Sequence, residues 1–172
     1  PFRRVMIAGG GNIGLRLAQT IESRFNVKVL EYDKLRCEML ADTLQRAVVL
    51  NMDATDQERL LEENVEQCDA FCALTNDDEV NIMSSLLAKR LGVRQVVTLI
   101  GKPAYVDLVQ GGEIDIAISP QQATSSLLLS YVRRADVVRA HSLRRGAAEA
   151  IEAIAHGDAK SSRVVGRQIR NI

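Results

Sequence analysis

The segment from Gly9 to Gly14, which reads GGGNIG, constrains the fold of this 172-residue chain more than any other feature. It matches the pattern G-x-G-x-x-G, follows the β-branched run of residues 5–8 and opens a stretch with helical spacing. In such a setting Gly9 permits a tight turn, Gly11 lets a pyrophosphate approach the backbone, and Gly14 lets the helix pack close to the sheet. The motif therefore predicts a strand–turn–helix unit that binds a dinucleotide at the helix N-terminus.

An acidic residue follows at the distance that this motif requires, about 20 residues on. Glu31 comes directly after the apolar run of residues 27–30, and Asp33 is the second choice because strand ends are uncertain by a residue or two. A carboxylate at this place accepts hydrogen bonds from ribose hydroxyl groups and repels a 2′-phosphate. The sequence thus predicts NAD(H), or another nucleotide with an unphosphorylated adenosine ribose, rather than NADP(H). A glycine-rich turn without a ligand is the alternative.

Apolar runs alternate with helix-like stretches through the first 120 residues. The predicted strands are nearly continuous in apolar residues, as expected for strands covered on both faces; they span residues 5–8, 27–30, 48–50, 70–74, 96–100 and 114–118. The predicted helices begin near residue 12 and then span residues 35–44, 57–63, 78–91, 104–109 and 122–133. In the first helix Ile13, Leu17 and Ile21 share one face, and Glu22 is expected to point to water. This alternation predicts an α/β fold with a doubly wound, parallel, six-stranded sheet of the Rossmann type.

The formal net charge is zero, but residues 1–120 carry a net charge of −5 and residues 121–172 a net charge of +5. The neutral total argues against a domain that coats nucleic acid or lies on an anionic membrane. The charge shift and a change of pattern predict two domains, a nucleotide-binding domain over residues 1–133 and the beginning of a truncated α+β domain over residues 134–172. In the second, residues 137–140 predict a strand. Helix propensity favours a helix around residues 148–154, although their alternation leaves a strand open.

No segment of the sequence predicts membrane insertion or secretion. The longest charge-free stretch, residues 116–132, is interrupted by Pro120 and by Gln, Thr and Ser residues, so it does not supply a spanning helix. Three cysteines, Cys37, Cys68 and Cys72, cannot make a paired disulfide framework and are expected to be buried or neutral. A reducing, cytosolic setting is the natural expectation.

Polar residues follow the third and fourth predicted strands, where the carboxyl ends of parallel strands form a ligand pocket. Asp53 and Ala54 would face the base or ribose, with a helix cap as the alternative role for Asp53. Thr75 and Asn76 would border the ribose or phosphate. The acids of residues 77–79 fit the start of a helix; the last two are interpreted as dipole-stabilising, and the first is left open. No further carboxylates or histidines converge here to indicate a metal.

Groups for chemistry on a bound nucleotide are missing from the sequence. A dehydrogenase needs a general acid or base beside the cofactor. The only histidines, His141 and His156, lie beyond the sixth predicted strand, and no Tyr-x-x-x-Lys pair is present. The sequence therefore predicts a protein that binds a nucleotide without turning it over and is not an enzyme. An NAD-dependent oxidoreductase domain is the alternative.

Taken together, the glycine motif, the acid after the second strand, the Asp-Ala-Thr of residues 53–55 and the TNDDEVN of residues 75–81 resemble the regulator-of-potassium-conductance (RCK) family, also called KTN or TrkA-N. The resemblance covers about residues 4–133. Beyond it, residues 140–153 (AHSLRRGAAEAIEA) closely resemble the segment that opens the C-terminal domain in such proteins. The resemblance also implies that a second, N-terminal copy of the unit exists in the full-length protein.

The family resemblance implies a cytoplasmic regulatory subunit, peripheral on the inner face of the cell membrane, under a potassium-translocating membrane subunit. Family members bind NAD(H) or adenine nucleotides, assemble as dimers and tetrameric rings, and gate potassium flux when the ring responds to its ligand. Leu99 and Gly101 stand where many family domains carry arginines near the phosphates, which favours NAD(H) over ATP or ADP. A purely structural ring-forming module with a vestigial pocket is another alternative. The predicted nucleotide contacts are Gly9, Gly11, Asn12, Ile13, Gly14, Glu31, Asp53, Ala54, Thr75 and Asn76.

Overall fold

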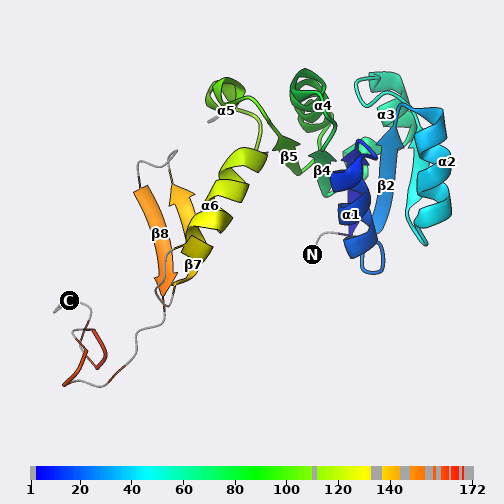
Figure 1. The fold of residues 1–172 in the computed structure, drawn as a ribbon. Helices are drawn as coiled ribbons and strands as arrows, with labels where there is room; N and C mark the ends of the chain where they lie inside the picture. The colour runs from blue at the N-terminus through cyan, green and yellow to red at the C-terminus, as the bar shows by residue number, and fades with distance from the viewer. Residues whose placement is uncertain are drawn as a thin grey trace. The chain divides into compact units, whose positions relative to one another are not determined.

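The computed structural model describes residues 3–109, 112–132, 137–143, 148–153, 157, 160–162, 164–166 and 168. The chain forms two compact units, residues 1–120 and residues 121–172 (Figure 1). The predicted domain boundary between Arg133 and Arg134 lies outside the described residues. Within the described part, no helix has both the length and the apolar character that a bilayer-spanning segment needs.

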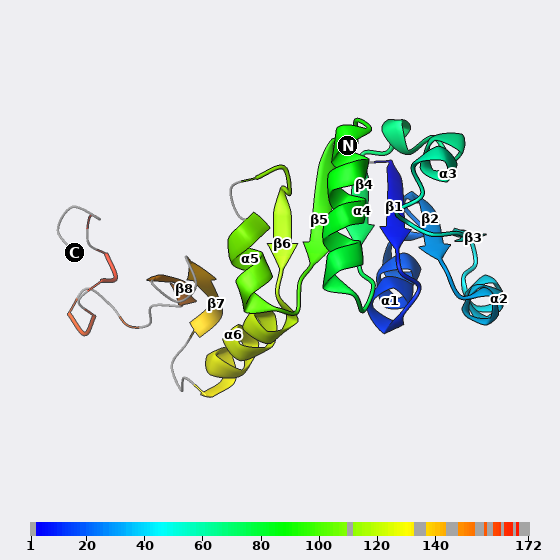
Figure 2. The same cartoon turned by 90° about the horizontal axis from the view of Figure 1, so that it is seen from above.

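The first unit is built on a six-stranded parallel sheet with the strand order β3-β2-β1-β4-β5-β6 (Figure 2). The strands are β1 (Arg4–Ala8), β2 (Asn26–Glu31), β3 (Val48–Asn51), β4 (Ala70–Ala73), β5 (Gln95–Leu99) and β6 (Ile116–Ile118). This order reverses between β1 and β4, which is the point where a doubly wound sheet opens a crevice at its carboxyl edge. The predicted six-stranded Rossmann-type sheet is confirmed, with strand ends one or two residues from those expected.

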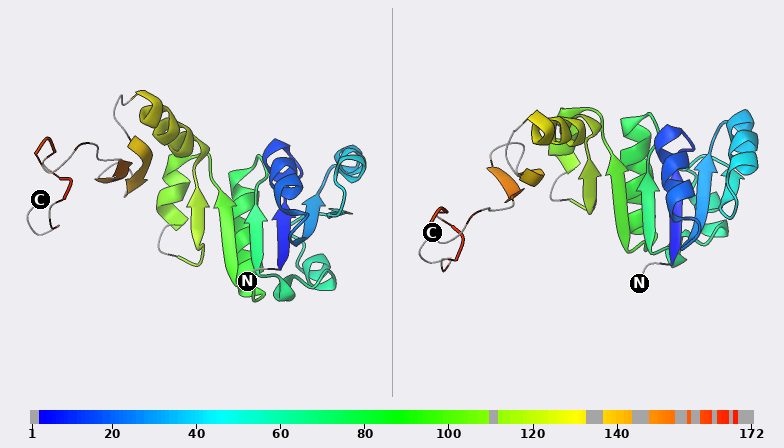
Figure 3. Two further views of the ribbon diagram at one scale, coloured as in Figure 1. Left: turned by 90° about the horizontal axis from the view of Figure 1, so that it is seen from below. Right: turned by 60° about the horizontal axis from the view of Figure 1, so that its bottom comes forward.

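Helices cover both faces of this sheet (Figure 3). They are α1 (Asn12–Ile21), α2 (Lys34–Thr43), α3 (Gln57–Glu62), α4 (Asp78–Arg90) and α5 (Pro103–Val109), with a 3₁₀ turn η1 (Val65–Gln67) after α3. On one face Ile7 and Val29 pack in a core with Leu40 of α2. On the other face Met6 and Leu60 belong to the core that α3, α4 and α5 cover. Burial on both faces explains why the strands are apolar almost throughout.

Glu22, at the end of α1, is buried and does not point to water as predicted. Its carboxylate accepts hydrogen bonds from the backbone N–H groups of Gln45, Arg46 and Ala47 at 3.0, 2.8 and 2.9 Å. Burial raises the pKa of Glu22, but these backbone hydrogen bonds outweigh it and hold the pKa below its ordinary value. The prediction was wrong because helical spacing cannot show that three unpaired N–H groups before β3 need an acceptor.

The second unit holds helix α6 (Pro120–Val132), apart from its first residue, and two antiparallel strands, β7 (Val137–Leu143) and β8 (Ala148–Ala153). The strand expected at residues 137–140 is confirmed. Residues 148–153 form a strand and not the helix that propensity favours, because their alternating sequence pairs with β7 from Leu143↔Ala148 to Val137↔Ala153.

Candidate functional site

A cavity of about 680 Å³ opens at the carboxyl ends of β1, β2, β3 and β4. Eight of the predicted contacts line this cleft: Gly9, Gly11, Asn12, Glu31, Asp53, Ala54, Thr75 and Asn76. Ile13 and Gly14, the second and third residues of α1, are not among the lining residues. The structure therefore brings together polar groups from four separate turns, at the reversal of the strand order where such a fold binds ligands.

Three of the four glycines in the motif have a reason within the protein itself. Gly9 has φ = +101°, and a Cβ there would lie 2.8 Å from the backbone nitrogen of Thr75. A Cβ on Gly10 would collide with Leu40, and a Cβ on Gly14 would collide with the carbonyl oxygen of Gly9. These glycines shape the turn and let α1 pack against it.

Gly11 is different from the other three. Its backbone has φ = −64° and ψ = −169°, a conformation open to any L-residue. A Cβ built there meets no heavy atom within 4 Å apart from its own chain neighbours, so it would lie in open space, and Gly11 itself lines the cleft. Neither strain nor packing accounts for a glycine at this position, whereas the close approach of a ligand would.

The N-terminus of α1 also differs from those of the next three helices. Asp33, Asp56 and Asp77 cap α2, α3 and α4, accepting hydrogen bonds from Arg36 N, Arg59 N and Val80 N at 2.7, 3.2 and 2.9 Å. Helix α1 has no side-chain cap and no acid in its first turn. Its positive dipole end therefore faces the cleft without a carboxylate of its own, as in anion sites at helix N-termini.

Glu31, the last residue of β2, lies beside the glycine turn. Its Oε2 accepts from the backbone N–H of Gly10 at 2.8 Å, and its Oε1 accepts from the N–H of Asp33 at 2.9 Å. Each carboxylate oxygen accepts more than one hydrogen bond. Glu31 is therefore oriented by the backbone and still able to accept from ribose hydroxyl groups. Asp33, the second choice, caps α2.

Asp53 does not cap the following helix. Its Oδ1 accepts hydrogen bonds from the backbone N–H and the hydroxyl of Thr55 at 2.8 and 2.7 Å, while Asp56 provides the cap. The alternative role considered for Asp53 is therefore wrong. Its carboxylate closes a tight turn at the rim of the cleft instead.

The side chain of Thr75 is held by Asn81, a fully buried residue of α4. Asn81 Oδ1 accepts from the hydroxyl and the N–H of Thr75 at 2.7 and 2.9 Å, and its Nδ2 donates to the carbonyl oxygens of Thr75 and Leu99, both at 3.0 Å. The single hydroxyl proton of Thr75 is thus engaged within the protein. Neither the hydroxyl proton nor the backbone N–H of Thr75 is therefore free to donate to a ligand.

The two acids interpreted as dipole-stabilising also bind the loop between β5 and α5. Asp78 accepts from the backbone N–H groups of Gly101 and Lys102, both at 2.8 Å. Glu79 accepts from Lys102 Nζ and from the Tyr105 hydroxyl, both at 2.8 Å. These two hydrogen bonds lower the pKa of Glu79 to about 2. The first turn of α4 therefore borders the cleft and is also hydrogen-bonded to α5 and to the loop before it.

Several residues that line the cleft escaped the sequence-based prediction. They are Leu30, Tyr32, Arg36, Met52, Leu74 and Val80; Asp77, whose role the sequence left open, lines the cleft as well. Arg36 is the only cation among them, and it stands one turn into α2, three residues after the cap Asp33. The sequence could have indicated Arg36, because α2 begins only three residues after Glu31 and its first turn therefore lies near the same end of β2.

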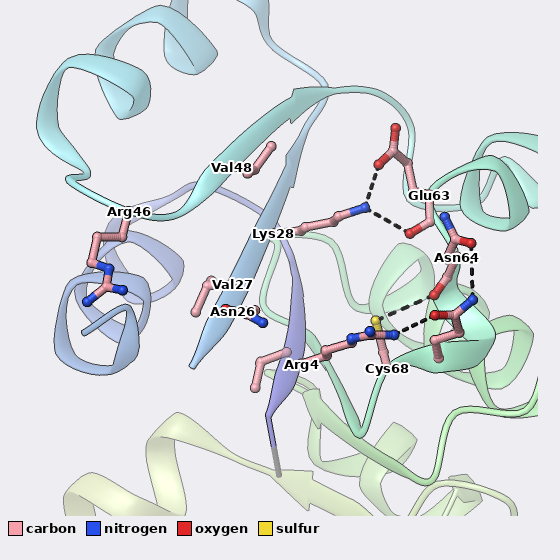
Figure 4. A pocket seen from close by; sticks show the side chains of 11 residues that line it. Arg4, Asn26, Val27, Lys28, Arg46, Val48, Glu63, Asn64 and Cys68 are labelled. Atoms are coloured by element: carbon pink, nitrogen blue, oxygen red, sulfur yellow. Dashed lines mark hydrogen bonds and ion pairs between the residues drawn. The ribbon is translucent and has the colours of Figure 1, made fainter. Parts of the chain in front are cut away.

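A second cavity, of about 440 Å³, lies at the opposite, amino ends of β1 and β2. Figure 4 shows Lys28 extended toward Glu63, where its Nζ donates to the carboxylate at 2.7 Å and to the backbone carbonyl at 2.9 Å. Arg4 donates to the side chain of Gln67. Lys28 and Arg4 are therefore engaged by the chain itself there.

All three cysteines are buried, as predicted. Burial raises the pKa of each thiol, and it raises the pKa of Cys72 to about 11. The thiols are therefore protonated at neutral pH and poor nucleophiles. In the part of the chain that the structure describes, no group of three or more His, Cys, Asp or Glu side chains is placed to hold a metal ion.

The fold and the cleft define a Rossmann-type domain with an open crevice at its carboxyl edge. The family model of the TrkA-N domain matches residues 5–120. The chain belongs to the TrkA-N family, which is regulatory and not catalytic. It is 66% identical to the Trk system potassium uptake protein TrkA of Halomonas elongata over 171 residues, 99% of this chain and 37% of that protein. It is 60% identical to TrkA of Vibrio alginolyticus over 172 residues, the whole chain and 38% of that protein. The chain thus spans somewhat more than a third of the length of these relatives.

Solved structures share the fold at low sequence identity. The GsuK channel bound to NAD superposes with a TM-score of 0.65 at 17% identity, covering 83% of this chain and 26% of that one. The TrkA-N domain of the inner membrane protein ybaL from Escherichia coli has a TM-score of 0.65 at 15% identity, covering 77% of this chain and 98% of that one. These matches agree with the strand order and support the fold assignment.

Proposed function

We propose that this chain is a nucleotide-binding regulatory domain of a potassium uptake system and that NAD(H) occupies its cleft, with ATP and ADP as alternatives. The pyrophosphate would lie over Gly11 at the open N-terminus of α1, and the adenosine ribose against Glu31. Support comes from the cleft, from the TrkA relatives and from the GsuK channel, which has the same fold and binds NAD.

One observation carries the nucleotide assignment. Gly11 is a glycine that the protein alone does not require, and it stands where a pyrophosphate would touch the backbone. A Gly11→Ala protein is expected to fold normally, with a free energy of unfolding within about 1 kcal/mol of the parent. The added methyl group would occupy the place of the phosphate and abolish binding.

Calorimetric titration with NAD, NADH, ATP and ADP tests this proposal. We expect NADH or NAD to bind the parent protein and the Gly11→Ala variant to lose at least about a hundredfold in affinity, equivalent to about 2.7 kcal/mol. Gly112→Ala is the matched control, since Gly112 is exposed and lies outside the cleft. Unchanged binding by Gly11→Ala would exclude the proposed pose. Flat titrations of the parent with all four nucleotides would favour a structural module with a vestigial pocket.

We further propose that the domain works at the cytoplasmic face of the membrane, bound to a potassium-translocating membrane subunit. The relatives' membership in the Trk system supports this partner. A nucleotide regulates such an assembly only by binding one arrangement better than another, and a tenfold preference is worth about 1.4 kcal/mol per site. Hydrogen exchange of the full-length assembly should therefore change with saturating NADH. Identical exchange with and without nucleotide would remove the physical basis for gating.

Self-association into a dimer or a tetrameric ring is part of this proposal. Four apolar residues from neighbouring positions of β5 and β6 share one face: Val97 beside Ile116, and Leu99 beside Ile118. Ile116 and Ile118 remain about 40% exposed, whereas Ala117 between them faces the core of the opposite side. A second copy covering this face would remove apolar surface from water.

A further inference from the structure

Arg36 and Glu31 both form hydrogen bonds with the backbone of Gly10 in the glycine turn. Its Nε donates to the carbonyl oxygen of Gly10 at 2.8 Å, while Glu31 Oε2 accepts from the N–H of Gly10 at 2.8 Å. The guanidinium and the carboxylate therefore lie on either side of one residue at the adenosine end of the cleft, which both line. Asp33, which follows the strand, uses its carboxylate to cap α2 through the backbone N–H of Arg36.

The charge of Arg36 is not neutralised by an ion pair. Three ion pairs occur among the described residues, Lys28–Glu63, Lys89–Asp115 and Lys102–Glu79, and Arg36 is in none of them. Neither Nη1 nor Nη2 of Arg36 donates a hydrogen bond to a described residue. A half-buried guanidinium that lines a cavity with two unused nitrogens is a receptor for oxygen atoms of a ligand, phosphate oxygens above all.

We infer that Arg36 is a specificity-determining residue that limits the discrimination of Glu31 against a 2′-phosphate. The inference rests on the proposed function, because it concerns the ribose edge of the nucleotide in that cleft. Glu31 favours NADH by accepting from the 2′-hydroxyl, and Arg36 supplies donors that partly offset the repulsion when that oxygen carries a phosphate. The ligand class of the cleft thus extends to NADP(H), bound more weakly than NAD(H).

The test compares the affinities of NADH and NADPH, measured by calorimetry, in the parent and in Arg36→Met. Met keeps much of the side-chain volume and removes the charge and the donors. We expect the ratio of NADH to NADPH affinity to rise about tenfold, as for the loss of one charge-assisted hydrogen bond. Arg36→Lys, which keeps the charge but loses the planar fork, should fall between the two. Lys34→Met, which removes an exposed cation from the same helix outside the cleft, is the matched control.

A purely structural role of Arg36 predicts a different result. If Arg36 only holds Gly10, the Met variant weakens NADH and NADPH by the same factor and leaves the ratio unchanged, which would overturn the inference. If the ratio of NADH to NADPH affinity rises equally in Lys34→Met, the effect comes from the overall positive charge of α2 and not from Arg36. That result would also overturn the inference. If the parent binds neither nucleotide, the proposed function itself fails, an outcome distinct from an unchanged ratio.

Discussion

At the scale of single residues, carboxylates fasten backbone N–H groups at both ends of the sheet. Glu31 holds Gly10 and Asp33 at the cleft, and Glu22 holds the segment before β3 at the opposite edge. Each of these carboxylates accepts hydrogen bonds from backbone N–H groups that have no partner within a strand or helix and would otherwise need water. A change at such a residue therefore costs stability through the unpaired N–H groups that it leaves.

Replacing Glu22 with Ala is expected to lower the free energy of unfolding by about 2 kcal/mol at pH 7, because three N–H groups lose their acceptor. The pKa of Glu22 is lowered by folding, so its contribution is fully present above the ordinary value of 4.5 and is lost as the pH falls through the lowered value. Urea denaturation at pH 7 and pH 3 checks both points. Glu38→Ala, at an exposed acid of α2, should cost less than about 0.5 kcal/mol. Equal losses for the two variants at pH 7 would contradict this role.

Sequence reasoning found some of these residues and missed others for a physical reason. The glycines and Glu31 follow from a motif whose members have fixed spacing along the chain. Arg36, Asn81 and Glu22 act on partners that the fold brings near, such as Gly10, Leu99 and Arg46. The direction of such a side chain depends on how one helix packs over another turn, which periodicity does not reveal.

At the scale of elements, the first turn of α4 joins the cleft to α5. Asn81 connects the ends of β4 and β5, and Asp78 binds the two N–H groups that begin the loop before α5. A displacement of this turn by a ligand would therefore move the loop as well.

Changing Asp78 to Asn should loosen the connection between α4 and α5. The amide of Asn has one acceptor oxygen, and its NH2 group would face one of the two backbone N–H groups. One of the two hydrogen bonds is therefore lost. Amide exchange at Gly101 or Lys102 is expected to accelerate about tenfold, equivalent to about 1.4 kcal/mol. Exchange in β1, on the far side of β4, should stay as in the parent and serves as the internal control. Unchanged exchange at both loop amides would show that Asp78 does not hold the loop.

The Glu79 carboxyl provides a spectroscopic check on the same connection. Its pKa is about 2 because Lys102 and Tyr105 donate hydrogen bonds to it. Any stability that it contributes is present above pH 4.5 and disappears as the pH falls through about 2. In Lys102→Met the pKa of Glu79 should rise toward its ordinary value, as followed by NMR titration of the carboxyl carbon. Lys34→Met is the control, and a pKa that stays near 2 in Lys102→Met would contradict the contact.

Strands and helices of the first unit were predictable because short, nearly continuous apolar runs alternate there with stretches of helical spacing. The piece over residues 148–153 was not, because Ala and Glu favour a helix while their alternation favours a strand. Pairing with β7 decides between the two, and that partner lies several residues away along the chain. Local propensity gives way wherever a neighbouring strand supplies the backbone hydrogen bonds.

At the scale of the whole molecule, the apolar face of β5 and β6 argues for self-association. Ile118→Asp is expected to shift the assembly toward monomer in sedimentation equilibrium, because a buried charge opposes the contact between copies. Met83→Asp, at an exposed apolar residue of α4, is the matched control and should leave the mass unchanged. Thermal unfolding of both variants separates loss of assembly from loss of folding. A parent protein that remains monomeric at high concentration would contradict the dimer.

The strand order has a mechanical consequence. Strands β1, β2 and β3 come from the first part of the chain and β4, β5 and β6 from the next, and the two halves of the sheet meet along one seam between β1 and β4. The cleft lies over that seam. Gly11 and Glu31 line it from the half that holds β1 and β2, and Thr75 and Asn76 line it from the half that holds β4. A nucleotide bound across this seam would contact both halves of the sheet and hold them in one arrangement, and its release would remove that restraint.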